Sequence, residues 1–146
     1  MSGSTTTLIA ALLAQAALAL VLLWLLGVRR LPLVGSGAIK VADIALSREP
    51  WPKAAQQASN AFDNQFQLPV LLYAGGGLAL YFGVTSLEAA LAWVFVISRI
   101  VHAAIFVTTN HVHRRFAAYA VGYAVLIVLW LDLVVRLFLI ASHQGS

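Results

Sequence analysis

Four side chains in a strongly apolar chain could together do chemistry, and they are Arg99, His102, Arg115 and Tyr119. Arg99 lies in the middle of an apolar stretch, residues 87–109, and His102 follows it by one helical turn. An arginine at membrane depth costs about 2.5–3.5 kcal/mol on insertion scales, so it normally faces a bundle interior and has a partner or a function. Guanidinium and phenol groups in such an interior could bind and stabilise an anion. These residues therefore mark a candidate enzyme site.

The composition of the chain indicates an integral membrane protein. The 146 residues are 62% hydrophobic and only 10% charged, which is more apolar than a soluble domain of this size requires. The absence of cysteine excludes disulfides and thiolate metal sites. The net charge of +4 comes from clustered basic residues, so it indicates orientation in a membrane, and no nucleic-acid partner is expected.

Four apolar stretches are close to the length of about 20 helical residues that crosses a bilayer. They are residues 7–28, 68–84, 87–109 and 116–140. The second helix is expected to begin outside the membrane at about residue 52 and to be kinked by Pro69 where it enters. A tight turn is predicted at residues 83–86, and an irregular loop at residues 29–51. The fold class predicted is all-α, a single four-transmembrane-helix domain over residues 1–146.

Lysine and arginine counts predict the orientation of the helices. The loop after the first stretch carries Arg29, Arg30, Lys40, Arg48 and Lys53, and the loop after the third carries Arg114 and Arg115. The tails and the loop after the second stretch carry neither residue type. By the positive-inside rule, both basic loops are cytosolic and both termini are outside.

This orientation brings polar side chains from three helices to one cytosolic layer. The second helix contributes Asn60, Asp63, Asn64 and Gln67, the third contributes Arg99 and His102, and the fourth contributes Arg115 and Tyr119. Such a cluster suits a polar, anionic ligand that enters from the cytosol, whereas the surrounding helix faces suit an apolar substrate.

Each of these residues also has a structural explanation. Arg114 and Arg115 could be anchors that reach lipid headgroups, and Arg99 could form an ion pair with Asp63. Interhelical hydrogen bonding would account for the neutral polar residues, which are Asn64, Gln67 and His102. The convergence of all of them on one layer favours a site.

Other features are interpreted as structural. Asp132 and Arg136 are four residues apart, so a pair between them or a subunit contact is expected. Residues 75–77 are three glycines, which provide a surface for close helix packing. His111 and His113 do not share a helix face and have no acidic neighbour, so no metal site is predicted.

Two segments resemble the MAPEG superfamily, the membrane-associated proteins in eicosanoid and glutathione metabolism. Residues 64–73 are similar to the corresponding segment of the bacterial members of this superfamily. Their sequence is Asn-Gln-Phe-Gln-Leu-Pro-Val-Leu-Leu-Tyr. Residues 99–102, followed by residues 110–115 and Tyr119, resemble the microsomal prostaglandin E synthase branch without a gap. The similarity covers residues 60–123, and the combination of motifs is more specific than any one of them.

The resemblance implies a homotrimer in a bacterial inner membrane, with glutathione bound as co-substrate between subunits on the cytosolic side. It assigns Arg115 to stabilising the thiolate and Tyr119 to contacting the thiol. It assigns glutathione binding to Asn64, Gln67 and His102, and it gives Arg99 a structural or a binding role. Arg29 or Arg30 would supply a basic binding residue at the end of the first helix.

The chain departs from the family pattern at the carboxylate end of this site. Asn60 and Asp63 stand where glutathione-binding members carry arginines, and Gln67 stands in place of a glutamate. Phe106 replaces a tyrosine. Asp63 would repel a carboxylate of glutathione, so the resemblance supports the thiolate end of the site more strongly than the carboxylate clamp.

The function expected is a glutathione- or thiol-dependent transferase or peroxidase that acts on lipophilic electrophiles or hydroperoxides. A non-catalytic member that binds membrane lipids or a partner protein is the alternative, and the altered clamp favours it. A small transporter is less well supported, because the outer half of the helices offers little polar surface beyond Asp132 and Arg136.

The predicted orientation can be tested with a tag on the C-terminus. We expect a membrane-impermeant reagent to label this tag in intact spheroplasts, since the positive-inside rule places it outside. A tag that is labelled only after lysis would reject the orientation.

Overall fold

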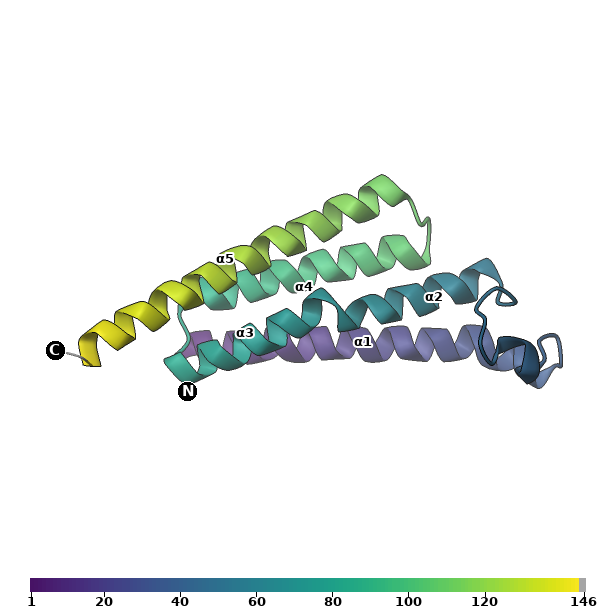
Figure 1. Ribbon diagram of the computed structural model, residues 1–146, viewed down its shortest axis with the longest axis horizontal. Coiled ribbons are helices and arrows are strands. Elements are labelled where there is room, and N and C mark those ends of the chain that lie inside the picture. The colour runs from purple at the N-terminus through teal and green to yellow at the C-terminus, as the bar shows by residue number, and fades with distance from the viewer. Residues whose placement is uncertain (145–146) are drawn as a thin grey trace.

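A computed structural model describes residues 1–144, and all regular structure in that range is helical (Figure 1). The α-helices are α1 (Gly3–Gly35), α2 (Lys53–Asp63), α3 (Leu68–Phe82), α4 (Ser86–Val107) and α5 (Val112–Gln144). Two 3-10 helices, η1 (Val41–Ile44) and η2 (Asn64–Phe66), lie before and after α2. We call the end of the bundle with residues 83–85 the turn end, and the end with residues 36–52 and 108–111 the loop end. The all-α prediction is confirmed.

Three helices in the described part of the chain are long and apolar enough to cross a membrane, namely α1, α4 and α5. The remaining predicted span, residues 68–84, corresponds to α3, which has only 15 residues. In Figure 1, α2 and α3 follow one another as an interrupted rod beside α1. The membrane character of the protein is therefore confirmed, whereas the crossing by α3 remains a prediction.

The first helix is longer than the sequence predicts. It continues past residue 28 to Gly35, so Arg29 and Arg30 lie on the helix and not in the loop. Arg29 explains the extension, because its Nη1 donates to Ala54 O (2.7 Å) and its Nη2 donates to Val107 O (3.1 Å). These bonds fix the last turns of α1 against α2 and the end of α4.

The interruption between α2 and α3 lies ahead of the predicted kink at Pro69. Residues 64–66 form η2, and Gln67 has the non-helical angles φ −103° and ψ −106°. Pro69 is in the first turn of α3, where its missing N–H costs no hydrogen bond. Because proline has no N–H to continue the hydrogen bonding of the preceding helix, the helix opens over residues 64–67 and a new helix begins at Leu68.

The core is built from small residues that allow close helix packing. A Cβ on Gly76 would lie 3.0 Å from Leu12 of α1, and one on Gly75 would lie 3.3 Å from Leu129 of α5. The expectation of close packing is confirmed for these two glycines, whereas Gly77 has no atom within 4 Å of such a Cβ. Fully buried Phe95 and Leu129 lie in the same apolar cluster, at the centre of the bundle.

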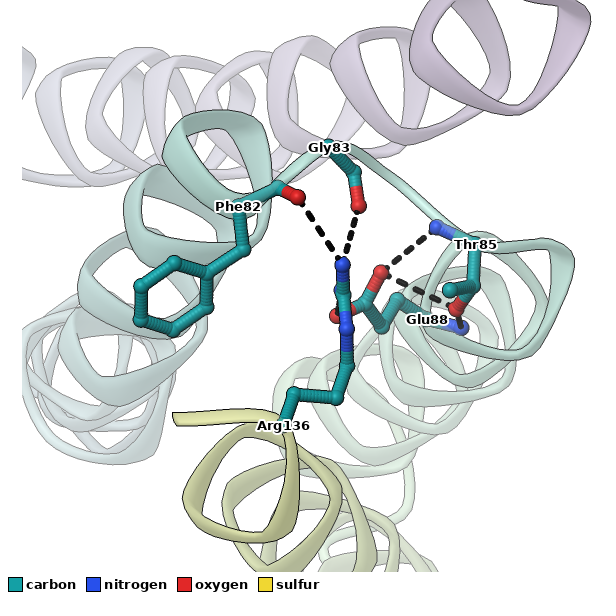
Figure 2. A network of polar contacts seen from close by, with 5 residues as sticks. All are labelled: Phe82, Gly83, Thr85, Glu88 and Arg136. Carbon is teal, nitrogen blue, oxygen red and sulfur yellow. Dashed lines mark hydrogen bonds and ion pairs between the residues drawn. The ribbon is translucent and has the colours of Figure 1, made fainter. Parts of the chain in front are cut away.

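A polar network closes the turn end of the bundle (Figure 2). Gly83 has φ 86°, and Thr85 caps α4 in a capping box with Glu88. The second carboxylate oxygen of Glu88, Oε1, is bonded by Nη1 of Arg136 from α5. Nη2 of Arg136 donates to Phe82 O (3.0 Å) and Gly83 O (2.6 Å), which are carbonyls at the C-terminal end of α3.

The expectation that Arg136 pairs with Asp132 is therefore wrong. The partner is Glu88, which is fully buried and lies on another helix. The interhelical pair is preferred because Arg136 also satisfies two helix-end carbonyls, which an exposed pair within α5 would leave without a partner.

Arg136→Gln is expected to destabilise the protein by about 3 kcal/mol, because it leaves the buried Glu88 carboxylate without its counter-ion. Thermal unfolding in detergent measures this loss. Arg114→Gln, at an exposed position of the same helix, serves as the matched control and should leave the melting temperature unchanged. Equal melting of the two variants would contradict the assignment, and Glu88→Gln combined with Arg136→Gln should recover part of the loss.

Candidate functional site

A pocket of about 480 Å³ lies at the loop end between α2, α4 and α5. Its lining residues are Asn60, Asp63, Asn64, Gln67, His102, Phe106, Val112, Arg115, Phe116 and Tyr119. Five of the predicted site residues thus come together, and they are Asn64, Gln67, His102, Arg115 and Tyr119. Most of the predicted polar layer therefore lines one pocket.

The turn between α4 and α5 positions Arg115. Asn110 has φ 50°, and its backbone N–H donates to Ile105 O (2.7 Å), so the chain reverses tightly. The side-chain Oδ1 of Asn110 accepts a hydrogen bond from Arg115 Nη1 (2.5 Å). The guanidinium carbon of Arg115 lies 4.0 Å from the centre of the Phe106 ring. One hydrogen bond and one cation–π contact therefore fix the guanidinium.

Aromatic contacts connect His102 to the rest of the pocket. Its ring lies edge-to-face with Phe106 at a centroid distance of 5.7 Å, and 6.1 Å from the ring of Tyr119. His102 is only 3% exposed. The histidine thus forms the inner wall between the residues of α4 and Tyr119 of α5.

Arg99 does not line the pocket but lies directly behind it. It is completely buried, and its Nη2 donates a long hydrogen bond to Asn64 O (3.5 Å). Its guanidinium carbon lies 5.9 Å from the centre of the Tyr119 ring. Its Nε and Nη1 have no hydrogen-bond partner among the described residues. Arg99 therefore supports two walls of the pocket from the bundle interior.

The expected ion pair between Arg99 and Asp63 is not present. Asp63 Oδ2 instead accepts from Nη1 of Arg48 at 2.5 Å. Arg48 lies in the loop before α2. The sequence predicts only irregular structure for this loop. The loop conformation brings this arginine to the end of α2, and Arg99 is held one turn deeper by a backbone carbonyl.

Arg30 also lies outside the pocket of a single chain. Its guanidinium carbon is 4.5 Å from the centre of the Trp51 ring, so it stacks on the segment that leads into α2. The side chain points to the loop and its Nε is buried without a described partner. Within one chain, Arg30 therefore does not join the predicted binding residues.

The sequence analysis assigns no role to three residues that shape the pocket. Val112 and Phe116 form an apolar wall on α5, and Asn110 orients Arg115 without lining the pocket. The sequence could have indicated the turn at Asn110, because asparagine is among the residues that tolerate a positive φ in a tight turn. Within residues 1–144, no group of three or more acidic, histidine or cysteine side chains could hold a metal ion.

An all-helical membrane protein with a polar pocket at one end of its bundle is the class that the fold and this site define. A family model gives a more specific assignment than this class. The MAPEG family model matches residues 7–135, which is most of the chain, and the protein belongs to this family. No curated protein and no solved structure matches the chain. The matched range includes every residue that lines the pocket, and the resemblance in the sequence is confirmed.

The role of Asn110 can be separated into backbone and side-chain parts. Asn110→Gly keeps the positive φ without strain and loses the bond to Arg115, whereas Asn110→Ala loses both. Asn110→Ala should therefore be about 1 kcal/mol less stable than Asn110→Gly. Thermal unfolding in detergent measures the difference, and equal stability of the two variants would show that the positive φ is not required.

Proposed function

We propose that this MAPEG protein is a thiol-dependent transferase or peroxidase, with glutathione as co-substrate and a lipophilic electrophile or hydroperoxide as second substrate. The observation that carries this proposal is the placement of Arg115. Its guanidinium lines a polar pocket with Tyr119 and has no carboxylate partner among the described residues. An uncompensated cation in a recess of a membrane protein suits an anionic reactant.

The chemistry follows from the charge of Arg115. A free thiol has a pKa of about 8.5, so it is largely protonated at neutral pH. A nearby guanidinium stabilises the thiolate, and the hydroxyl of Tyr119 can donate to it. In conjugation to an aryl chloride, the thiolate sulfur forms a bond to the electrophilic carbon, the C–Cl bond breaks and chloride leaves. In peroxide reduction, it attacks the peroxide oxygen, the O–O bond breaks to give an alcohol, and a second thiol completes a disulfide and releases water.

The assembly forms part of the same proposal. In it, α3 and the adjoining η2 complete a fourth crossing, and three copies of the chain form a homotrimer in a bacterial inner membrane, with both termini outside. The apolar side chains that face outward on α1, such as Leu20 and Trp24, support contact with lipid or another copy. In a trimer, Arg30 of one subunit would be available to a neighbour.

A binding role without turnover is the second candidate. Asp63 favours it, because a carboxylate in the pocket wall opposes a second anionic group on the ligand. A transporter finds less support, since Glu88 and Arg136 at the turn end bond to each other and to backbone carbonyls and do not extend the pocket.

Arg115→Ala should lower thiol conjugation to an aryl chloride by about 100-fold or more, because it removes the group that stabilises the thiolate. Arg114→Ala is the matched control, since it removes the same charge from the adjacent position outside the pocket. Both rates are measured in detergent, with melting temperatures as a check on folding. Unchanged turnover in Arg115→Ala would overturn the assignment, and thiol binding without turnover in the wild type would favour the binding role.

A further inference from the structure

Asp63 gives the pocket a charge that its thiol chemistry does not require. Among the described residues that line the pocket, Asp63 is the one carboxylate and Arg115 is the one guanidinium. They come from different helices, α2 and α5. The cavity therefore presents one anionic and one cationic group to whatever it binds.

The carboxylate of Asp63 is already neutralised, but by a residue outside the pocket. Its Oδ2 is paired with Arg48 Nη1 at 2.5 Å, and Oδ1 accepts no hydrogen bond from the described residues. The side chains of Arg48 and Asp63 are 64% and 42% exposed. Exposed ion pairs contribute little to stability, so a second cation can exchange with Arg48 at small cost.

The neighbours of Asp63 add acceptors for such a cation. Asn64, which lines the pocket, donates its Nδ2 to Asn60 O (3.1 Å), and its Oδ1 accepts no hydrogen bond from the described residues. Gln67 lines the same wall and is neutral, so no second carboxylate competes there. An ammonium group has three donors and matches a carboxylate with adjacent amide oxygens.

We propose that Asp63 is a specificity-determining residue that selects thiols carrying a free ammonium group. The ammonium replaces Arg48 at Asp63, while the thiolate of the same ligand is held at Arg115. Thiols that lack an ammonium at that position are disfavoured, because they leave the Arg48 pair in place or present only an anionic group to the carboxylate. This inference rests on the proposed thiol-binding function and specifies its co-substrate class.

A matched pair of ligands tests the inference. The probes are glutathione and its glutaryl analogue, in which hydrogen replaces the amino group, and their Kd values are measured by titration calorimetry in detergent. The wild type should bind glutathione about tenfold more tightly than the analogue, as expected for one charge-assisted contact at a partly exposed site. Asp63→Asn should abolish this preference.

Two further variants make the test specific. Arg48→Gln removes the competing guanidinium, so it should increase the preference for the amine, and it tests the inference even if Asp63→Asn does not fold. Glu49→Gln is the control, because it removes a charge next to Arg48 at an exposed position outside the pocket and should leave the preference unchanged.

The outcomes separate this inference from the function on which it rests. Equal binding of the two probes by the wild type, or a preference that survives in Asp63→Asn, would overturn the role of Asp63 and leave thiol binding intact. Failure of the wild type to bind either probe would overturn both. A preference that is lost in Asp63→Asn and increased in Arg48→Gln would support the proposal.

Discussion

The pocket depends on the interruption of the helix at residues 64–67. Backbone groups released from a helix inside a membrane need new partners, because lipid offers none. Gln65 provides one, since its Nε2 donates to Ala61 O (2.9 Å) and its Oε1 accepts from Nε2 of the fully buried Gln15 (2.9 Å). This connection to α1 stabilises the break. Asn64 and Gln67, which line the pocket with residues of α4 and α5, lie within this break.

Arg99 supports the same break from the opposite side. Its bond to Asn64 O reaches the residue at which α2 ends, and its guanidinium faces the ring of Tyr119. A fully buried arginine with one long hydrogen bond is expensive in a membrane. Its contacts to two pocket walls indicate that it supports the pocket from behind, whereas Arg115 lines the pocket itself. Arg99, a charge that is costly to bury, therefore supports the pocket and does not line it.

Much of the site could be predicted because it follows from periodicity and depth. His102, Arg115 and Tyr119 lie near the facing ends of two apolar helices joined by a short turn, so their proximity needs no knowledge of the loops. The partners of Asp63 and Arg136 could not be predicted in the same way. Arg48 reaches Asp63 through the conformation of a 3-10 helix and loop, and Glu88 pairs with Arg136 across 48 residues. The extension of α1 depends likewise on the long-range bonds of Arg29.

The two ends of the bundle differ in how their charges are compensated, and this difference supports the placement of the proposed site at the loop end. At the turn end, Glu88 and Arg136 neutralise one another, and the remaining donors of Arg136 go to backbone carbonyls. At the loop end, Arg115 has only a neutral amide and an aromatic ring, and Asp63 has only an exposed guanidinium. Glu88 and Arg136 therefore use their charges within the protein. Groups with weak or neutral partners keep most of their electrostatic interaction energy for a ligand, which supports the proposal that a ligand binds at the loop end.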